Sequence, residues 1–198
     1  MADFFRTAIN DNTFIRSPAR LMWAGTTIAF PTSIGDIINL STYDAQTGWN
    51  DLGATKTGIT VTHNNTEEEF DVDQILGIID VRPVSYEQAV TTALAEASLQ
   101  RMQVAWQGGE ITNSGSEEQM GVGEPTVYLK RRLAVLFPKA DGKIRAHVFR
   151  LVTKSAQESA LAYNKTGEQV QIPVRFRALA DTSVVDVYTR TQVIFNQV

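Results

Sequence analysis

The most regular pattern of apolar and polar positions runs from Ser85 to Gly108. Ser85 and Gln88 have the spacing of a capping box, and the pair Gly108-Gly109 is typical of a helix end. The pattern predicts a helix over about 85–107. At about 100° per residue, this helix would carry two apolar stripes: Tyr86, Val90, Ala93, Leu94, Ala97 and Val104 in one, and Ala95, Leu99, Met102 and Trp106 in the other. A surface helix needs one apolar face, so two stripes indicate either a helix buried in its own core or one shared between subunits.

Most of the remaining chain shows the period-2 alternation of strands, separated by turn-forming residues. Residues 59–63 and 70–82 are expected to pair as a long hairpin that leads into the helix. Further strands are expected within 126–137, 144–153, 170–179 and 184–198, with a hairpin turn at Asp141-Gly142. Many short strands and a single helix predict a mainly-β chain. We expect one domain over 1–198, an antiparallel β-sandwich or barrel with one flanking α-helix.

Three segments have less regular patterns. Residues 1–30 are rich in large apolar side chains, including Phe4 and Phe5, which indicates an arm packed against a neighbouring subunit or else a simple N-terminal strand. A long loop and hairpin is expected over about 42–82, and its first part places Trp49 among turn formers. This tryptophan is either an anchor folded back on its own domain or a binding residue. Residues 109–125 are rich in Gly, Ser, Glu and Asn, which predicts a loop.

Composition excludes several classes of protein. The 198 residues include no cysteine, so disulfides, thiolate metal sites and cysteine nucleophiles are excluded. The net charge is −4, and the only basic cluster, Lys130-Arg131-Arg132, lies in a strand-like run that sends its side chains to both faces. A groove that grips DNA is therefore not expected, although a surface that must not hold DNA is allowed. We expect neither a signal peptide nor a membrane span, because no apolar run is long enough.

The sequence makes no positive case for catalysis. His63 and His147 are isolated at strand positions, and Asp71 and Asp73 lie two apart, as on one solvated strand face. No nucleotide-binding loop, calcium loop or serine-triad context is present. We therefore expect a protein that is not an enzyme and that has no cofactor or metal.

The order of several motifs indicates a family. The run GWNDLGATKTG at residues 48–58 is followed by a strand, an acidic hairpin and a helix rich in Ala, Glu and Leu. Gly35-Asp36-Ile37-Ile38 precedes this run, and QIPVRFRAL at residues 171–179, followed by Asp181, comes after it. Over roughly residues 17–185, this arrangement resembles the major tail proteins (tail tube proteins) of tailed bacteriophages.

The resemblance implies a structural function. In this family a β-sandwich or barrel-like subunit with a flanking helix forms rings of six, and the rings stack into a hollow tube through which DNA leaves the capsid. The implied partners are copies of the same chain and other tail proteins such as tape measure, terminator or baseplate components. DNA passes only transiently and without sequence specificity, and no membrane is involved. The implied location is the virion tail, assembled in the host cytoplasm.

On this hypothesis, the second helix stripe, the N-terminal arm and the loop around Trp49 supply subunit contacts. The predicted interface residues are Phe4, Phe5, Trp49, Leu52, Lys56, Leu99, Arg101, Met102 and Trp106. Arg101 falls within the main apolar stripe, so we expect it to pair with a carboxylate of its own subunit or of a neighbour.

Two alternatives come from other classes of protein. The first is a virion decoration or host-attachment module that binds a glycan through exposed aromatic residues such as Trp49 and Trp106. The second is a small β-barrel enzyme with a divalent-metal site at Asp71 and Asp73.

Overall fold

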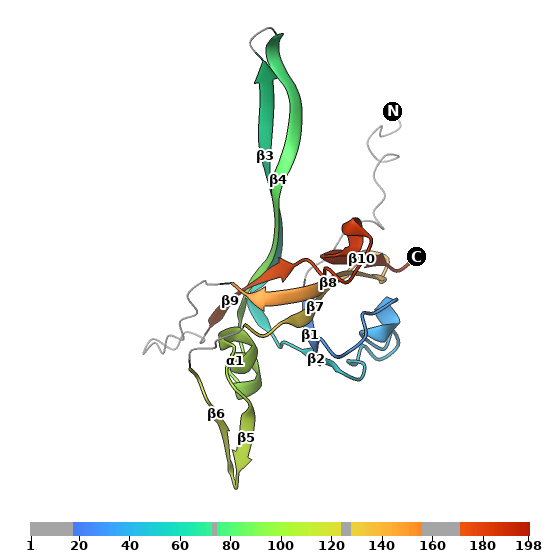
Figure 1. Ribbon diagram of the computed structural model, residues 1–198. Coiled ribbons are helices and arrows are strands. Elements are labelled where there is room, and N and C mark those ends of the chain that lie inside the picture. The colour runs from blue at the N-terminus through green and yellow to red at the C-terminus, as the bar shows by residue number, and fades with distance from the viewer. Residues whose placement is uncertain (1–17, 73–74, 124–127, 156–170) are drawn as a thin grey trace.

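The structure is a computed structural model that describes residues 18–72, 75–123, 128–155 and 171–198 (Figure 1). Its elements are, in chain order, β1 (Arg20–Gly25), the 3-10 turn η2 (Ile34–Asp36), β2 (Trp49–Asp51), β3 (Thr55–Val72), β4 (Ile75–Leu94), α1 (Leu99–Trp106), β5 (Ile111–Ser114), β6 (Glu117–Met120), β7 (Arg131–Pro138), β8 (Ile144–Lys154), β9 (Ile172–Leu179), the 3-10 turn η3 (Val187–Thr189) and β10 (Gln192–Asn196). The chain is mainly β with antiparallel sheets, and α1 is the single α-helix of the described residues, which confirms the predicted fold class.

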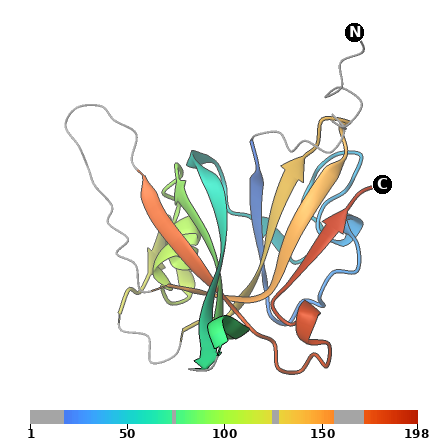
Figure 2. The same cartoon turned by 90° about the horizontal axis from the view of Figure 1, so that it is seen from above.

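Eight strands form one antiparallel sheet, which divides at β8. The strand order is β2-β1-β7-β8-β9-β4-β3, and β10 also pairs with β8. The first half of β8 pairs with β10 and its second half pairs with β9, while β7 runs along its other edge. Figure 2 shows the consequence: the part with β9, β4 and β3 turns away from the part with β1, β7 and β8. The sheet bends at β8, so the inner faces of the two parts lie opposite each other as the layers of a sandwich.

The main core fills the space between these two parts and α1. Alternate residues of β7 and β8 point into it, among them Leu133, Val135 and Phe149. The facing part contributes inward residues of β4 and β9, and α1 closes one side with Val104 and Ala105. This alternation is the period-2 pattern of the sequence, so the core follows directly from it.

A second core covers the opposite face of β1, β7 and β8. The other alternate residues of these strands, such as Met22, Ala134 and Val148, pack there against the segment between β1 and β2. That segment is fixed by the η2 turn, where the Asp36 carboxylate accepts hydrogen bonds from the Thr32 and Ser33 backbone N–H groups at 2.8 and 3.0 Å. These strands are therefore buried on both faces, which a surface arm would not be.

The predicted helix over about 85–107 is wrong in its first half. Residues 85–94 belong to β4, and α1 begins only at Leu99, after the N-cap residue Ser98. β4 pairs with β3 on one edge and, over Ala89–Leu94, with β9 on the other. Because two ladders satisfy the backbone of 89–94 and the side chains of Val90 and Leu94 enter the core, tertiary pairing outweighs a helical pattern in the sequence.

The predicted end of the helix is correct to within a residue or two, but the cap differs. Gln107, not a glycine, adopts the left-handed conformation with φ 55°, and the N–H of Gly108 donates to Gln103 at 3.2 Å. Gly108 is needed for a different reason: a Cβ there would lie 2.6 Å from the Met120 sulfur. Met120 thereby packs β6 onto the end of α1.

Other boundaries also need correction. The expected hairpin of 59–63 with 70–82 extends over 55–72 and 75–94, and the expected loop 109–125 contains the hairpin β5–β6. In the described part of residues 1–30 the alternative of an N-terminal strand holds, because β1 pairs with β2 and β7 as an inner strand of the sheet. The strands expected within 126–137 and 184–198 shorten to β7 and β10, whereas β8 and β9 lie close to their predicted bounds.

Candidate functional site

The strands β3 and β4 continue far beyond the sheet as a two-stranded ribbon. β9 pairs with β4 only over Ala89–Leu94, and Ala89 lies opposite Thr62. Past this point neither strand has a third partner among the described residues. We call residues 63–72 and 75–88 the projecting hairpin; it rises from the molecule on the side opposite β5–β6 (Figure 1). Ten residues of β3 at ~3.3 Å each give it a length of about 30 Å.

The projecting hairpin exposes large apolar side chains. Ile78, Val84 and Tyr86 are 55, 62 and 55% exposed, and Phe70 and Val81 are also exposed. An isolated two-stranded hairpin is marginally stable in water, and its unpaired edges offer backbone groups to another chain. The hairpin thus leaves both apolar side chains and strand edges open to solvent.

The hairpin also concentrates negative charge. Residues 63–88 contain seven Asp or Glu and one Arg, a net charge of −6; because the whole chain carries −4, the remainder carries +2. Glu67, Glu68 and Glu69 are exposed on β3. The single arginine, Arg82, pairs with Asp80 at 3.0 Å and lies over the Phe70 ring at 5.0 Å, so the described cation of the hairpin is already engaged.

Ion pairs fasten the root of the hairpin to the neighbouring strand. Glu87 of β4 accepts from Arg175 of β9 at 3.2 Å and lies 3.6 Å from Arg177. His63, Tyr86 and Gln88 form a second cluster there, with Gln88 Nε2 2.9 Å from His63 Nδ1. These contacts fix the place where the two-stranded ribbon leaves the sheet.

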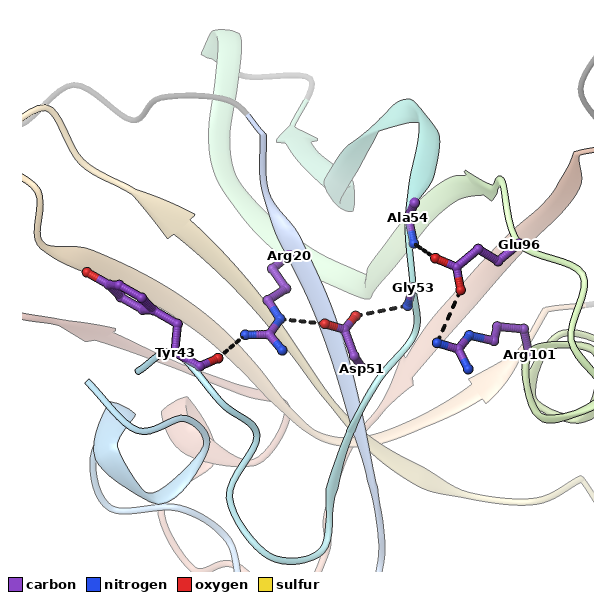
Figure 3. A network of polar contacts seen from close by, with 7 residues as sticks. All are labelled: Arg20, Tyr43, Asp51, Gly53, Ala54, Glu96 and Arg101. Atoms are coloured by element: carbon purple, nitrogen blue, oxygen red, sulfur yellow. Dashed lines mark hydrogen bonds and ion pairs between the residues drawn. The ribbon is translucent and has the colours of Figure 1, made fainter. Parts of the chain in front are cut away.

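A network of polar contacts fixes the joint between β2 and β3 (Figure 3). Arg20 donates to Asp51 at 2.5 Å and to the Tyr43 carbonyl, and the second Asp51 oxygen accepts the Gly53 N–H at 2.9 Å. One residue further on, Ala54 donates its N–H to Glu96 at 3.0 Å.

The same Glu96 carboxylate pairs with Arg101 of α1 at 3.2 Å. Arg101 is therefore paired within its own chain, which is one of the two arrangements expected from the sequence. Gly53 has φ 90°, and a Cβ there would come within 2.8 Å of Glu96 Oε2. The residue before β3, the segment after β4 and α1 thus meet at one carboxylate, at the end of the β3–β4 pair that lies away from the projecting hairpin.

The structure divides the predicted interface residues into three groups. Trp49 and Leu52 are 4 and 0% exposed and belong to the two cores, so the interface assignment of their side chains is replaced by a core role. For Trp49 this is the anchor alternative, and it removes the residue from a glycan-binding surface. Lys56 is exposed at the start of β3. Phe4 and Phe5 lie outside the described residues.

The helical members of the set are only half-buried. Leu99, Arg101, Met102 and Trp106 keep part of their surface exposed, while Met102 and Trp106 pack on the main core. The Trp106 indole N–H is buried and has no hydrogen-bond partner within the described structure. Met102 and Trp106 therefore contribute to the packing of the chain's own core, and Arg101 contributes to the ion pair with Glu96.

Sequence reasoning missed the length of the hairpin and the role of Glu96. The run of β-branched residues Val90, Thr91 and Thr92 was the available signal for a strand. Nothing in the sequence indicated that Glu96 would contact both Ala54 and Arg101. Ala54 and Glu96 are 42 residues apart, so only the folded chain brings them together.

Two observations bear on the other classes of protein. In the described ranges, no group of three or more His, Cys, Asp or Glu side chains comes together as metal ligands would; the side chains of Asp71 and Asp73 lie outside what is described. No helix in the described part of the chain has the length and apolar character needed to cross a bilayer.

Arg131 and Arg132 lie on opposite faces of β7, as the alternation predicted. Arg131 stacks over Trp23 at 4.4 Å, and Arg132 donates to the Ile28 carbonyl at 2.7 Å.

Comparison of the sequence with models of known protein families and with curated proteins finds no match.

Proposed function

We propose that this chain is a structural subunit of a bacteriophage tail tube, which self-assembles into stacked rings that conduct DNA into the host. The observation that carries the proposal is the projecting hairpin. It places exposed apolar side chains and two unpaired strand edges on an element that is not stabilised by a third strand. Contact with another copy would bury those side chains and pair those edges.

Charge supports association between copies. Residues 63–88 carry −6 and the remainder of the chain +2, so the hairpin of one subunit is attracted to the body of another rather than to a second hairpin. Such a contact is head-to-tail, and head-to-tail contacts generate rings when the rotation closes and filaments when it does not. A tube of stacked rings needs contacts that close within each ring and contacts that continue from one ring to the next.

The net negative charge supports a conduit for DNA. A wall that presented lysine and arginine to the duplex would release counterions and retain the DNA. A chain with net charge −4, whose Arg131 and Arg132 are engaged with aromatic and carbonyl groups of its own fold, offers little to hold phosphates. The number of six subunits per ring and the tail-protein partners come from the family resemblance alone.

Electron microscopy of the purified chain tests the proposal. Stacked rings or tubes, with a central channel wide enough for duplex DNA, are the expected result. Discrete monomers or trimers at every concentration would reject the tube assignment and favour an attachment or decoration module.

A further inference from the structure

A groove of about 680 Å³ lies where the projecting hairpin meets η3 and β10. Tyr86 and Gln88 of the hairpin root line one wall, and Tyr188 and Gln192 line the other. Its volume falls within the ~300–1,000 Å³ of small-molecule sites. The fold and the hairpin contacts described above assign no role to this groove.

The groove is lined by uncharged side chains. None of its described lining residues is Asp, Glu, Lys or Arg, and its polar groups are amides, three hydroxyls and the imidazole of His63. A nucleic acid would need cations to contact its phosphates. The chain's own hairpin tip, with Glu67–Glu69, is equally unsuited, because no described lysine or arginine of the lining would receive it. The lining is matched to a neutral ligand.

An aromatic side chain is held open at the mouth of the groove. Tyr188 is 90% exposed, yet its backbone is fixed because its N–H donates to the Asp186 carboxylate at 3.1 Å. Arg150 holds the next residues, donating from Nε to the Thr189 carbonyl at 2.6 Å and from its backbone to Thr191 at 3.0 Å. The fixed backbone keeps the Tyr188 ring at the groove, where its aromatic face can stack on a flat apolar surface.

A buried amide in the groove lacks a partner. Gln88 is 5% exposed, its Nε2 contacts His63 Nδ1 and the Tyr86 hydroxyl, and its Oε1 is buried without a hydrogen bond. Turning the amide over would only exchange which end lacks a partner. A buried polar atom left in this way is costly. Because this atom is buried, a ligand hydroxyl reaches it once the Gln88 side chain turns toward the groove, and it pairs in either orientation because a hydroxyl both donates and accepts.

We propose that this groove binds a neutral oligosaccharide. A sugar ring combines an apolar C–H face, which stacks on Tyr188 or Tyr86, with hydroxyls at its edge, which reach Gln88, His63 and Gln192. A purely apolar ligand would leave Gln88 Oε1 without a partner, and an anionic ligand would meet no lysine or arginine among the described lining residues. The site does not depend on tube assembly.

Titration calorimetry of the full chain with maltotriose, cellotriose and triacetylchitotriose tests the site, with hydrogen exchange to locate it. We expect saturable binding of at least one of these sugars, with slowed exchange in residues 63–65, 83–88 and 187–194. Tyr188→Ala should weaken binding about tenfold or more, as loss of one stacking contact would. The matched control Tyr128→Ala removes a tyrosine that is 54% exposed outside the groove, and it should leave binding unchanged.

Three results would overturn the proposal: no saturable binding of any of the three sugars, binding that survives Tyr188→Ala, or protection of residues 187–194 that rises with protein concentration in the absence of sugar. The last result would mean that a second copy fills the groove. Assembly in the microscope and sugar binding are separate readouts, so each proposal can fail without the other.

Discussion

Glu96 and Arg101 pair at 3.2 Å at the point where β4 ends and α1 begins, and the second oxygen of Glu96 accepts the Ala54 N–H at 3.0 Å. One carboxylate thereby joins the helix to the residue that precedes β3. Gly53 comes directly before Ala54, and its backbone conformation and lack of a Cβ make room for the contact. We expect the packing of α1 against the start of β3, and with it the stability of the subunit, to depend on this joint.

Gly53→Ala should disturb the joint. The substitution places a Cβ 2.8 Å from Glu96 Oε2 at a residue with φ 90°, so both strain and a clash arise. We expect a loss of about 1–3 kcal/mol in the free energy of unfolding by denaturant titration. Gly58→Ala is the matched control, because a Cβ there has nothing within 4 Å. Equal stability of the two variants would contradict this account of the joint.

Arg101→Ala removes the cation of the same joint. The Arg101 side chain is 23% exposed and Glu96 is 47% exposed, so we expect a loss of about 1 kcal/mol in unfolding free energy and impaired ring formation. Arg82→Ala breaks an ion pair whose side chains are 70 and 53% exposed, and its unfolding free energy should change little. Unchanged stability and assembly of Arg101→Ala would remove Arg101 from the joint.

Trp49→Ala tests whether this tryptophan belongs to the core. The side chain is 4% exposed and packs with residues from the β1–β2 connection and the sheet. Its loss should reduce the unfolding free energy by about 3–5 kcal/mol in a denaturant titration. Tyr188→Ala, at a residue that is 90% exposed, should leave stability unchanged. A Trp49→Ala variant of nearly wild-type stability would restore the interface assignment.

Stability should fall as the pH drops below the ordinary histidine range. Burial lowers the pKa of His147 below 6.5, helped by the positive charges of His63 and Arg145. The unfolded chain therefore takes up the proton first, and the stability that is present above pH 6.5 declines as the pH falls toward the folded-state pKa. Denaturant titrations of wild type and His147→Phe between pH 7.5 and 5 should differ in slope. Parallel curves would show that His147 does not contribute.

The strands that form the cores were predictable because both of their faces are buried in alternation. Leu133 and Val135 enter one core and Ala134 and Leu136 the other, and this period of two is visible in the sequence. Aspartate and glycine at 141–142 likewise specified the β7–β8 turn, in which Gly142 has φ 79°.

The first half of the predicted helix was not predictable from local pattern. Ser85, Gln88 and the alanines that follow suit a helix, but Ala89 and Ala93 also suit a strand crossed closely by β3 and β9. Only the partner strands decide between the two, and one of them lies some 85 residues away in sequence. The joint at Glu96 was missed for the same reason, since a surface glutamate carries no sign of its distant partner.

The projecting hairpin should drive assembly through its exposed aliphatic residues. Ile78→Ser with Val84→Ser removes two side chains that are 55 and 62% exposed, and Val122→Ser with Val185→Ser removes two that are 61 and 92% exposed elsewhere. Neither pair supports a core, so both double variants should stay folded, with unfolding midpoints close to wild type.

Sedimentation velocity of the wild type and these two double variants over a range of concentrations tests the central claim most directly. We expect the wild type and the Val122/Val185 variant to form large ring or tube species at the same concentration. The Ile78/Val84 variant should remain a folded monomer until at least about tenfold higher concentration, since each buried aliphatic side chain contributes ~1.5–3 kcal/mol when fully removed from water. Equal assembly of the two double variants, or a wild type that stays monomeric throughout, would contradict it.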